Sequence, residues 1–351
     1  MRKLECALAL FSLLVLAACN GQPGKPGSGS GSGGEEPQAL LKASPSGDEA
    51  PAQTRSFPTL TVPSIYGEGS DEAKDYVLEH YWDAFFKGDG KTGPDTVLGI
   101  ADGNVEQALA NYIQILATVK SMATPDDMEP LKKAQNSVKR FFRKLEARQK
   151  ADTTALTYLR LTEIVARYLY DPNSPMRDED LYLPFVEAMA DSPCTRDDLR
   201  TACRHELQMC RTNPFGSKAP DFSFSRIDGS KGRLYGVKAE YTMLFFSNPG
   251  CESCKEIIRD VMSRDYVESY IASGRLAIVN IYVDEEINAW RDYHHNYPSS
   301  WINGYDYTFS LRDSWKYDIR AIPSLYLLDS GKRVLMKDAP TEKVLSFLDN
   351  I

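Results

Sequence analysis

The chain has 351 residues, more than one ordinary small domain needs, and this length predicts two folded units. Hydrophobic residues make up 42% of it and charged residues 26%, a balance that excludes collagen-like, fully disordered and multi-span membrane proteins. The formal net charge of -8 argues against nucleic acid or an anionic membrane surface as an electrostatic partner. Its 7 cysteines are too few for a disulfide-framework protein, so each is assigned by its position.

The N-terminus has the pattern of an export signal. Arg2 and Lys3 precede a short apolar run, residues 7–16, which is too brief to span a bilayer as a stable helix. The run ends in Leu-Ala-Ala-Cys at residues 16–19, which resembles the lipobox of bacterial lipoproteins. This resemblance implies that residues 1–18 are a signal peptide and that Cys19 is lipidated.

With a lipid on Cys19, we expect the protein to be anchored in the cell envelope, at the periplasmic face or the cell surface of a Gram-negative bacterium. Cys6 is then lost with the signal peptide. In the alternative, an ordinary secretory signal is cleaved nearby and Cys19 stays a plain thiol. Both routes lead to an oxidising compartment outside the inner membrane.

Gly, Ser, Pro, Gln and Glu dominate residues 19–57, with an unbroken Gly/Ser run at 27–34. This composition cannot bury a core, and it predicts a flexible linker.

Residues 58–212 form a predicted helical domain of unknown function. Apolar residues recur there at helical spacing, as at Tyr112, Leu116 and Val119, and five or six helices are expected. Breaks fall at residues 88–93, 124–126 and 171–175. The last helix is expected to start at Thr195, with Asp198 completing a capping box, and to run to about residue 211.

Three cysteines fall in the same region. Cys203 and Cys210 are seven residues apart on the last predicted helix, about 10 Å along its axis and beyond the reach of a disulfide. Cys194 precedes that helix. We expect buried or reduced thiols at all three positions, with a tertiary bridge or a partner as the alternative.

Residues 213–351 alternate strand-like and helical segments. A strand predicted at 241–247 leads through the turn Asn-Pro-Gly at 248–250 into a C-x-x-C motif formed by Cys251 and Cys254. A helix follows from about residue 255 to 264, and then a strand at 275–283. In this βαβ setting a C-x-x-C pair indicates a redox centre, and the sequence has no second such pair to complete a zinc site.

The spacing of the pair has a chemical consequence. Cys251 stands at the start of a helix, where free backbone N–H groups and the helix dipole favour a thiolate and should lower its pKa. Cys254 lies one turn later. The two sulfurs can therefore form a short-loop disulfide, or Cys251 can attack a substrate disulfide while Cys254 resolves the mixed intermediate.

A second motif reads Trp-Lys-Tyr-Asp-Ile-Arg-Ala-Ile-Pro-Ser at residues 315–324, followed by predicted strands at 325–328 and 333–336 and a closing helix at 341–351. With the C-x-x-C pair it resembles the thioredoxin superfamily, most closely the TlpA-like thiol-disulfide oxidoreductases. The resemblance implies that Pro323 is a cis-proline that positions substrate backbone beside the sulfurs. Ile322, just before it, resembles reducing members, which implies a reductase or isomerase.

The wider arrangement also resembles a group of exported proteins. A lipoprotein signal, a helical domain of unknown function and a TlpA-like end occur together in Bacteroidetes lipoproteins. The phrases Asn-Pro-Gly-Cys at 248–251 and Trp-Ile-Asn-Gly-Tyr-Asp at 301–306 resemble the same group.

Several positions depart from the family pattern. Gly250 stands where many relatives have tryptophan, Phe245 where thioredoxins have a buried aspartate, and Ile257 where some TlpA-like reductases have glutamate. The proton acceptor for Cys254 is therefore unassigned. Glu252 and Glu256 also introduce negative charge that opposes a thiolate at this helix start.

His294 and His295 lie on a predicted helix in the insert between the central strands. With Cys251 and Cys254 they suggest a copper-delivery site of the kind found in related chaperones. That family usually spaces its cysteines by three residues and not by two, so we favour surface histidines and no metal site.

The sequence thus predicts an α+β two-domain chain, in which an N-terminal all-α domain precedes an α/β thioredoxin-like fold with a mixed sheet flanked by helices. Signal peptide, linker, helical domain and thioredoxin-like domain occupy residues 1–18, 19–57, 58–212 and 213–351. The expected function is a membrane-anchored thiol-disulfide oxidoreductase without a cofactor. Its expected partners are protein or small-molecule disulfide and thiol substrates and an upstream thiol-disulfide electron donor. The alternative is a non-catalytic lipoprotein whose helical domain binds a partner or ligand and whose thioredoxin-like domain is a scaffold.

Overall fold

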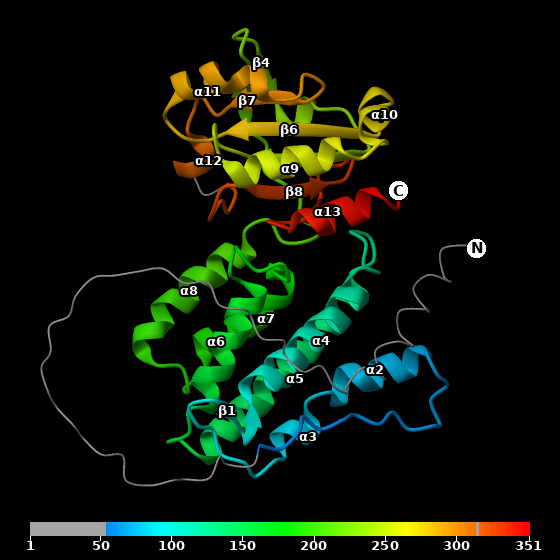
Figure 1. Ribbon diagram of the computed structural model, residues 1–351, viewed down its shortest axis with the longest axis vertical. Helices are drawn as coiled ribbons and strands as arrows, with labels where there is room; N and C mark the ends of the chain where they lie inside the picture. The colour runs from blue at the N-terminus through cyan, green and yellow to red at the C-terminus, as the bar shows by residue number, and fades with distance from the viewer. Residues whose placement is uncertain (1–53, 314–315) are drawn as a thin grey trace, which may run out of the picture.

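The computed structural model describes residues 54–313 and 316–351. The predicted signal peptide, the predicted lipidation site Cys19, Cys6, most of the predicted linker and Trp315 lie outside these residues. The described residues form a helical part and a sheet part, which occupy the lower and upper halves of Figure 1. The predicted order, helices first and then a mixed sheet flanked by helices, is confirmed.

The helical part contains six long helices and one short one, where the periodicity predicts five or six. They are α2 (Asp71–His80), α3 (Asp83–Phe86), α4 (Asp102–Lys120), α5 (Glu129–Ala151), α6 (Thr157–Leu169), α7 (Glu179–Asp191) and α8 (Asp197–Arg211). The three predicted breaks fall between α3 and α4, between α4 and α5, and between α6 and α7. Two short strands, β1 (Thr96–Val97) and β2 (Ile100–Ala101), pair in this otherwise all-α region.

The start of α8 differs from the sequence expectation. Arg196, not Thr195, is the N-cap residue, and its side chain makes no capping hydrogen bond. Thr195 is 3% exposed, and its hydroxyl donates to the backbone oxygen of Met189 at 2.6 Å. The capping box therefore does not form, because tertiary burial gives the Thr195 hydroxyl a different acceptor.

The sheet part has seven strands in the order β4-β3-β7-β6-β5-β8-β9. The strands are β3 (Ser223–Ser225), β4 (Lys231–Arg233), β5 (Tyr241–Phe246), β6 (Leu276–Tyr282), β7 (Ile302–Tyr305), β8 (Ser324–Leu328) and β9 (Val334–Met336). Strands β5, β6 and β7 run parallel, and β3, β4, β8 and β9 pair antiparallel with their neighbours. The helices are α9 (Glu252–Met262), α10 (Val267–Ala272), α11 (Ile287–Tyr293), α12 (Ser310–Asp313) and α13 (Thr341–Leu348), with 3-10 turns η1 (Leu234–Gly236) and η2 (His294–Asn296).

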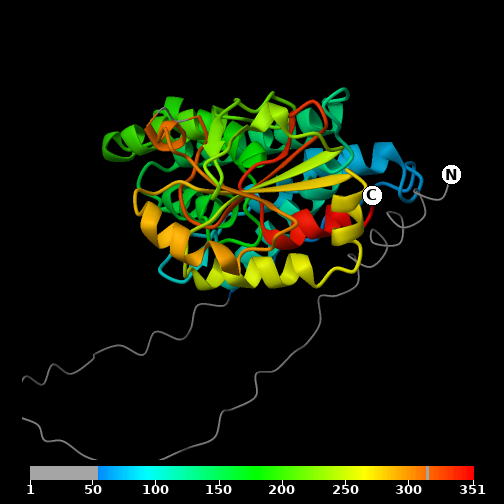
Figure 2. The ribbon, with the colours of Figure 1, turned by 90° about the horizontal axis from the view of Figure 1, so that it is seen from above.

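Apolar side chains of β5 point alternately to the two sides of the sheet, so both faces of the sheet are apolar there. Phe245 packs in the core beneath α9 and α13, with Val261 and Val344. Phe246 points to the other face, where it packs with Tyr326. Figure 2 shows α9 and α13 lying on the same side of the sheet. Successive residues of a strand face opposite sides, so a nearly continuous apolar run is what a strand buried on both faces requires.

A cluster of buried charged groups in the helical part extends to α13 of the sheet part, where Lys343 Nζ lies 3.8 Å from Asp178 Oδ2. Lys120 on α4 contacts Asp178 Oδ1 at 2.6 Å and Asp180 Oδ2 at 2.7 Å. Asp178 caps α7 by accepting from the backbone N–H of Leu181. Burial by itself would raise the pKa of Asp178, but the charge of Lys120 and that of Lys343 on α13 outweigh it and hold this pKa below its ordinary value.

Replacing Lys120 by methionine should lower the free energy of unfolding by about 3–5 kcal/mol at neutral pH, since it removes the cation that contacts both buried carboxylates and leaves Asp178 with the more distant Lys343. Urea denaturation measures this loss. The matched control is Lys133→Met, whose exposed pair with Asp75 should be worth at most about 1 kcal/mol. Because folding lowers the pKa of Asp178, its ionised form stabilises the fold at any pH above the pKa that this residue has in the unfolded chain. The difference between Lys120→Met and the unaltered chain should therefore shrink as the pH falls below about 4. Equal losses in the two variants would contradict this account.

Candidate active site

Cys251 and Cys254 form a disulfide at the start of α9. Their Cα atoms are 5.2 Å apart, within the range of disulfide-bonded cysteines. Cys251 is the N-cap residue, and its sulfur accepts a hydrogen bond from the backbone N–H of Cys254 at 3.2 Å. The helix begins about three residues earlier than the sequence predicts, so the whole pair belongs to its first turn. A thiolate on Cys251 would therefore face the free N–H groups of this helix end.

The turn before the pair depends on a glycine. Gly250 has a φ of 73°, in the left-handed region that favours glycine, and an added Cβ would meet no neighbouring atom. The backbone conformation, and not lack of space, is thus the physical reason for glycine here.

The two sulfurs differ in access to solvent. Cys251 is partly exposed, whereas Cys254 is 2% exposed and packs in the apolar core with Phe245 and Ile257. An external disulfide or thiol can therefore reach Cys251 but not Cys254. This asymmetry fits a nucleophile and a resolving thiol.

Pro323 lies at the same end of the sheet as the disulfide. The Ile322–Pro323 peptide bond is cis, and β8 begins at the next residue. In the antiparallel pair of β5 and β8, Ser324 stands opposite Phe246, the last residue of β5 before the turn to Cys251. Ile322 packs against the same apolar cluster as Cys251. The structure therefore brings together all four residues that the sequence places at this site.

The acidic residues near the pair are directed to solvent or neutralised. Glu252 contacts Lys255 at 2.6 Å, and the hydrogen bond and charge of this lysine lower the pKa of Glu252. Glu256 is exposed. The expected repulsion of a thiolate is thus reduced by Lys255 and by water.

A buried polar chain that the sequence reasoning missed lies under the turn. Ser247 donates to Asn280 Oδ1 at 2.5 Å, and Asn280 donates to Asn303 Oδ1 at 3.0 Å. Burial raises the pKa of the neighbouring Tyr297 to about 12. These side chains connect β6 and β7 to Ser247, the residue that follows β5 and precedes the turn to Cys251. The available signal was an asparagine inside an otherwise apolar strand.

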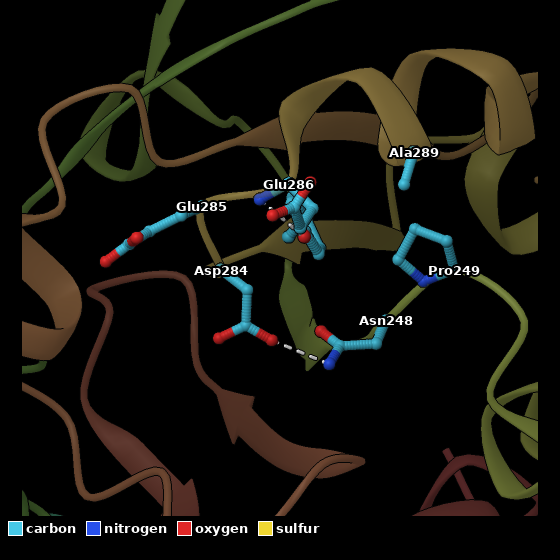
Figure 3. Close-up of a pocket in the computed structure, with 7 residues that line it drawn as sticks. Asn248, Pro249, Asp284, Glu285, Glu286 and Ala289 are labelled. Atoms are coloured by element: carbon cyan, nitrogen blue, oxygen red, sulfur yellow. Dashed lines mark hydrogen bonds between the residues drawn. The ribbon is translucent and has the colours of Figure 1, made fainter.

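A pocket of about 600 Å³ also opens beside this turn. Its lining residues are Asn248, Pro249, Tyr282, Asp284, Glu285, Glu286 and Ala289. Figure 3 shows the Asp284 carboxylate directed at Asn248, whose amide donates to Asp284 Oδ2 at 2.7 Å, while Glu285 points away from it. The pocket was not predicted, although its position at the carboxyl ends of two parallel strands is where ligand sites of such sheets form.

The three further cysteines of the described residues lie in the helical part, and the candidate residues His294 and His295 lie in the 3-10 turn η2 that follows α11. Cys194, Cys203 and Cys210 are free thiols, and the last two are buried in the helical part. His294 lies in the turn after α11 and packs edge-on against Trp290 at 5.1 Å. Within residues 54–313 and 316–351, no group of three or more His, Cys, Asp and Glu side chains could hold a metal ion.

Comparisons with known proteins agree with this architecture. Residues 35–213 match a family described as Domain of unknown function (DUF5106), a range that includes every helix from α2 to α8. A thioredoxin-like protein from Bacteroides caccae is 33% identical, with a TM-score of 0.67, and the match covers 84% of this chain and 99% of that one. A match over 84% of this chain is longer than either the helical part or the sheet part, so it includes residues of both parts.

Two further solved structures match shorter stretches. The C-terminal domain of an uncharacterized protein from Bacteroides fragilis is 40% identical over 40% of this chain and 99% of that one, with a TM-score of 0.38. A thiol-disulfide oxidoreductase from Bacteroides fragilis is 23% identical over 38% of this chain and 98% of that one, with a TM-score of 0.33. A search of curated proteins finds no match.

In the reduced protein, iodoacetamide should modify Cys251 and leave Cys254 protected, because only the first sulfur is accessible. Peptide mass mapping after short exposure near pH 7 distinguishes the two. We expect Cys251 to react faster in the folded chain than in the denatured chain, since the helix start favours its thiolate. A folded rate no higher than the denatured rate, or equal labelling of both cysteines, would contradict this account of the site.

Proposed function

Because the chain belongs to the thioredoxin-like proteins and to the family described as DUF5106, we propose that it is a thiol-disulfide oxidoreductase acting through Cys251 and Cys254. The observation that carries this proposal is the disulfide at the start of α9, beside the cis-proline Pro323 at the same sheet end. Within the thioredoxin superfamily we assign it to the TlpA-like proteins, on the motifs that resemble them.

The reaction begins with the reduced pair. The Cys251 thiolate attacks one sulfur of a substrate disulfide, forms a mixed disulfide and releases the other substrate sulfur as a thiolate, which takes up a proton. Cys254 then loses its proton and attacks the Cys251 sulfur, so that the second substrate thiol leaves. The substrate gains two electrons and two protons, and the protein ends with the Cys251–Cys254 disulfide.

An upstream dithiol protein must reduce this disulfide for the next cycle. We propose that the protein works as a reductase or isomerase, since Ile322 before the proline resembles reducing members. Pro323 and Ile322 hold the extended backbone of the substrate beside the accessible Cys251 sulfur. No cofactor is needed, because the electrons pass between sulfur atoms only.

The unaltered chain should reduce the disulfides of insulin with dithiothreitol as the electron donor, faster than dithiothreitol alone. Cys251→Ser should abolish this acceleration because it removes the attacking sulfur. Cys254→Ser should instead accumulate a mixed disulfide with insulin, visible by mass spectrometry. The matched control is Cys194→Ser, which removes another partly exposed thiol and should keep full activity.

No acceleration by the unaltered chain, or full activity in Cys251→Ser, would contradict the proposed function. Either result would favour the alternative in which the thioredoxin-like domain is a scaffold and the helical domain binds a partner.

We also propose a division into a helical domain at residues 58–212 and a thioredoxin-like domain at 213–351. The last helix of the helical part ends at Arg211 and the first strand of the sheet begins at Ser223, which supports a boundary between them. The preceding residues 1–18 and 19–57 act in this proposal as signal peptide and linker.

The anchor is the remaining element of the proposal. Among the helices of the described residues, none is both long enough and apolar enough to cross a bilayer. The Leu-Ala-Ala-Cys phrase supports a lipid on Cys19 that holds the protein in the cell envelope.

Replacing Cys19 by alanine should move the protein from the membrane fraction to the soluble fraction of the producing cells and abolish labelling with a palmitate analogue. Cys6→Ala is the matched control, since a residue within the signal peptide should not affect the lipid. Unchanged labelling of the Cys19→Ala protein would contradict the anchor.

A further inference from the structure

The segment that carries Pro323 is held on both of its sides by the Asp338 carboxylate. Arg320, three residues before the proline, donates from Nη2 to Asp338 Oδ2 at 2.9 Å. Ser324, directly after the proline, donates from its hydroxyl to Asp338 Oδ1 at 2.8 Å. One carboxylate therefore links the two ends of the cis-proline segment.

The same arginine reaches into the helical part. Its Nη2 also donates to Glu179 Oε1 on α7 at 2.9 Å, and its Nη1 donates to the backbone oxygen of Tyr170. The Arg320 guanidinium lies 4.1 Å from the centre of the Tyr170 ring. The residue that fixes the cis-proline segment is thus itself fixed by residues outside the thioredoxin-like part.

A second cation strengthens this connection. Lys337, which precedes Asp338, contacts Glu179 Oε2 at 2.6 Å and donates to the backbone oxygen of Met209 on α8 at 2.6 Å. Glu179 therefore has one carboxylate oxygen on Arg320 and the other on Lys337. Through these two contacts α7 binds the segment before β8, which contains Arg320, and the segment after β9, which contains Lys337.

These groups are shielded from water. The side chains of Glu179 and Lys337 are 3% and 2% exposed, and that of Arg320 is 14% exposed. Burial raises the pKa of Glu179 to about 7, while the charges of Lys337 and Arg320 act against this rise. Water screens charges weakly in such surroundings, and a buried charge that loses its partner is costly. A change of charge at Glu179 should therefore shift the positions of Arg320 and Lys337.

We infer that Glu179 is a positioning residue of the redox site, which sets the cis-proline segment through Arg320 and so makes substrate binding beside Cys251 dependent on the helical part of the chain. This inference rests on the proposed function. The described structure thereby gives the helical part a role in the activity, apart from any partner it binds.

The test compares full-length variants in the reduction of insulin by dithiothreitol. At pH 8, above the pKa of Glu179, Glu179→Gln keeps the shape of the side chain but removes the negative charge that contacts Arg320. Its KM for insulin should rise about tenfold, because the substrate-binding segment is displaced, while kcat changes less than about twofold. The alkylation rate of Cys251 should stay at the value of the unaltered chain, since the sulfur and the helix start are unchanged.

A second variant changes the other end of the contact. Arg320→Lys keeps the positive charge but loses the planar group that joins Glu179, Asp338 and Tyr170. It should show the same rise in KM with the same alkylation rate of Cys251. Near-ultraviolet circular dichroism and urea denaturation establish that each variant is folded under the assay conditions.

Asp180→Asn is the matched control on the same helix. It also removes a buried carboxylate charge, but the contacts of Asp180 lead to Lys120 and to the backbone N–H of Phe215. Asp180→Asn should lower stability and leave KM unchanged.

An unchanged KM in folded Glu179→Gln and Arg320→Lys, or an equal rise in Asp180→Asn, would overturn the inference. Failure of both variants to fold would also overturn it, because the cluster would then act on stability alone. Failure of the unaltered chain to reduce insulin is a different result, since it removes the proposed function itself.

Discussion

The antiparallel pairing of β5 with β8 is the constraint on which the site depends. It sets Phe246 opposite Ser324, and the turn to Cys251 leaves β5 at the point where the segment of Pro323 enters β8. The disulfide and the cis-proline are far apart in the sequence and meet only because this register holds. A shift by one residue would exchange the two faces of β8 and move Leu325 and Leu327 out of the core beneath α9 and α13.

Buried charged groups also fix the position of the cis-proline segment, in addition to the apolar packing of the sheet. The β5–β8 pairing fixes where the cis-proline segment enters the sheet. The hydrogen bonds of Arg320 and Ser324 to Asp338 fix the residues on either side of the proline. Glu179 extends the connection to α7. Burying ion pairs costs desolvation energy, and a hydrophobic interface would often be at least as stable. The cluster is therefore better explained by the geometry that it imposes than by the stability that it adds.

The sequence predicted the parts of the fold that depend on local pattern. The apolar run at Tyr241–Phe246, the turn that ends at Gly250 and the helix after Cys251 were all recognisable, since strand, turn and helix start each have their own residue signature. Pro323 needed the resemblance to a family, because no local pattern shows which strand it will join.

What could not be predicted depends on contacts between distant segments. Glu179 and Arg320 are 141 residues apart, and nothing near either residue indicates the other. The pocket beside Asn248 combines residues that follow two different strands. The local pattern at Thr195 predicts a helix cap, yet burial gives the Thr195 hydroxyl another acceptor. In each case tertiary packing decides an outcome that the local sequence leaves open.

The reduction potential of the Cys251/Cys254 couple tests the central claim most directly. It can be measured by equilibrating the full-length protein in thiol-disulfide buffers and counting free thiols on the pair by mass spectrometry. The account predicts a reversible two-electron couple above about -300 mV, closer to thioredoxin at about -270 mV than to strong oxidants at about -120 mV. A disulfide that stays oxidised well below about -300 mV would be a structural crosslink, and would contradict the claim that this pair is the redox centre.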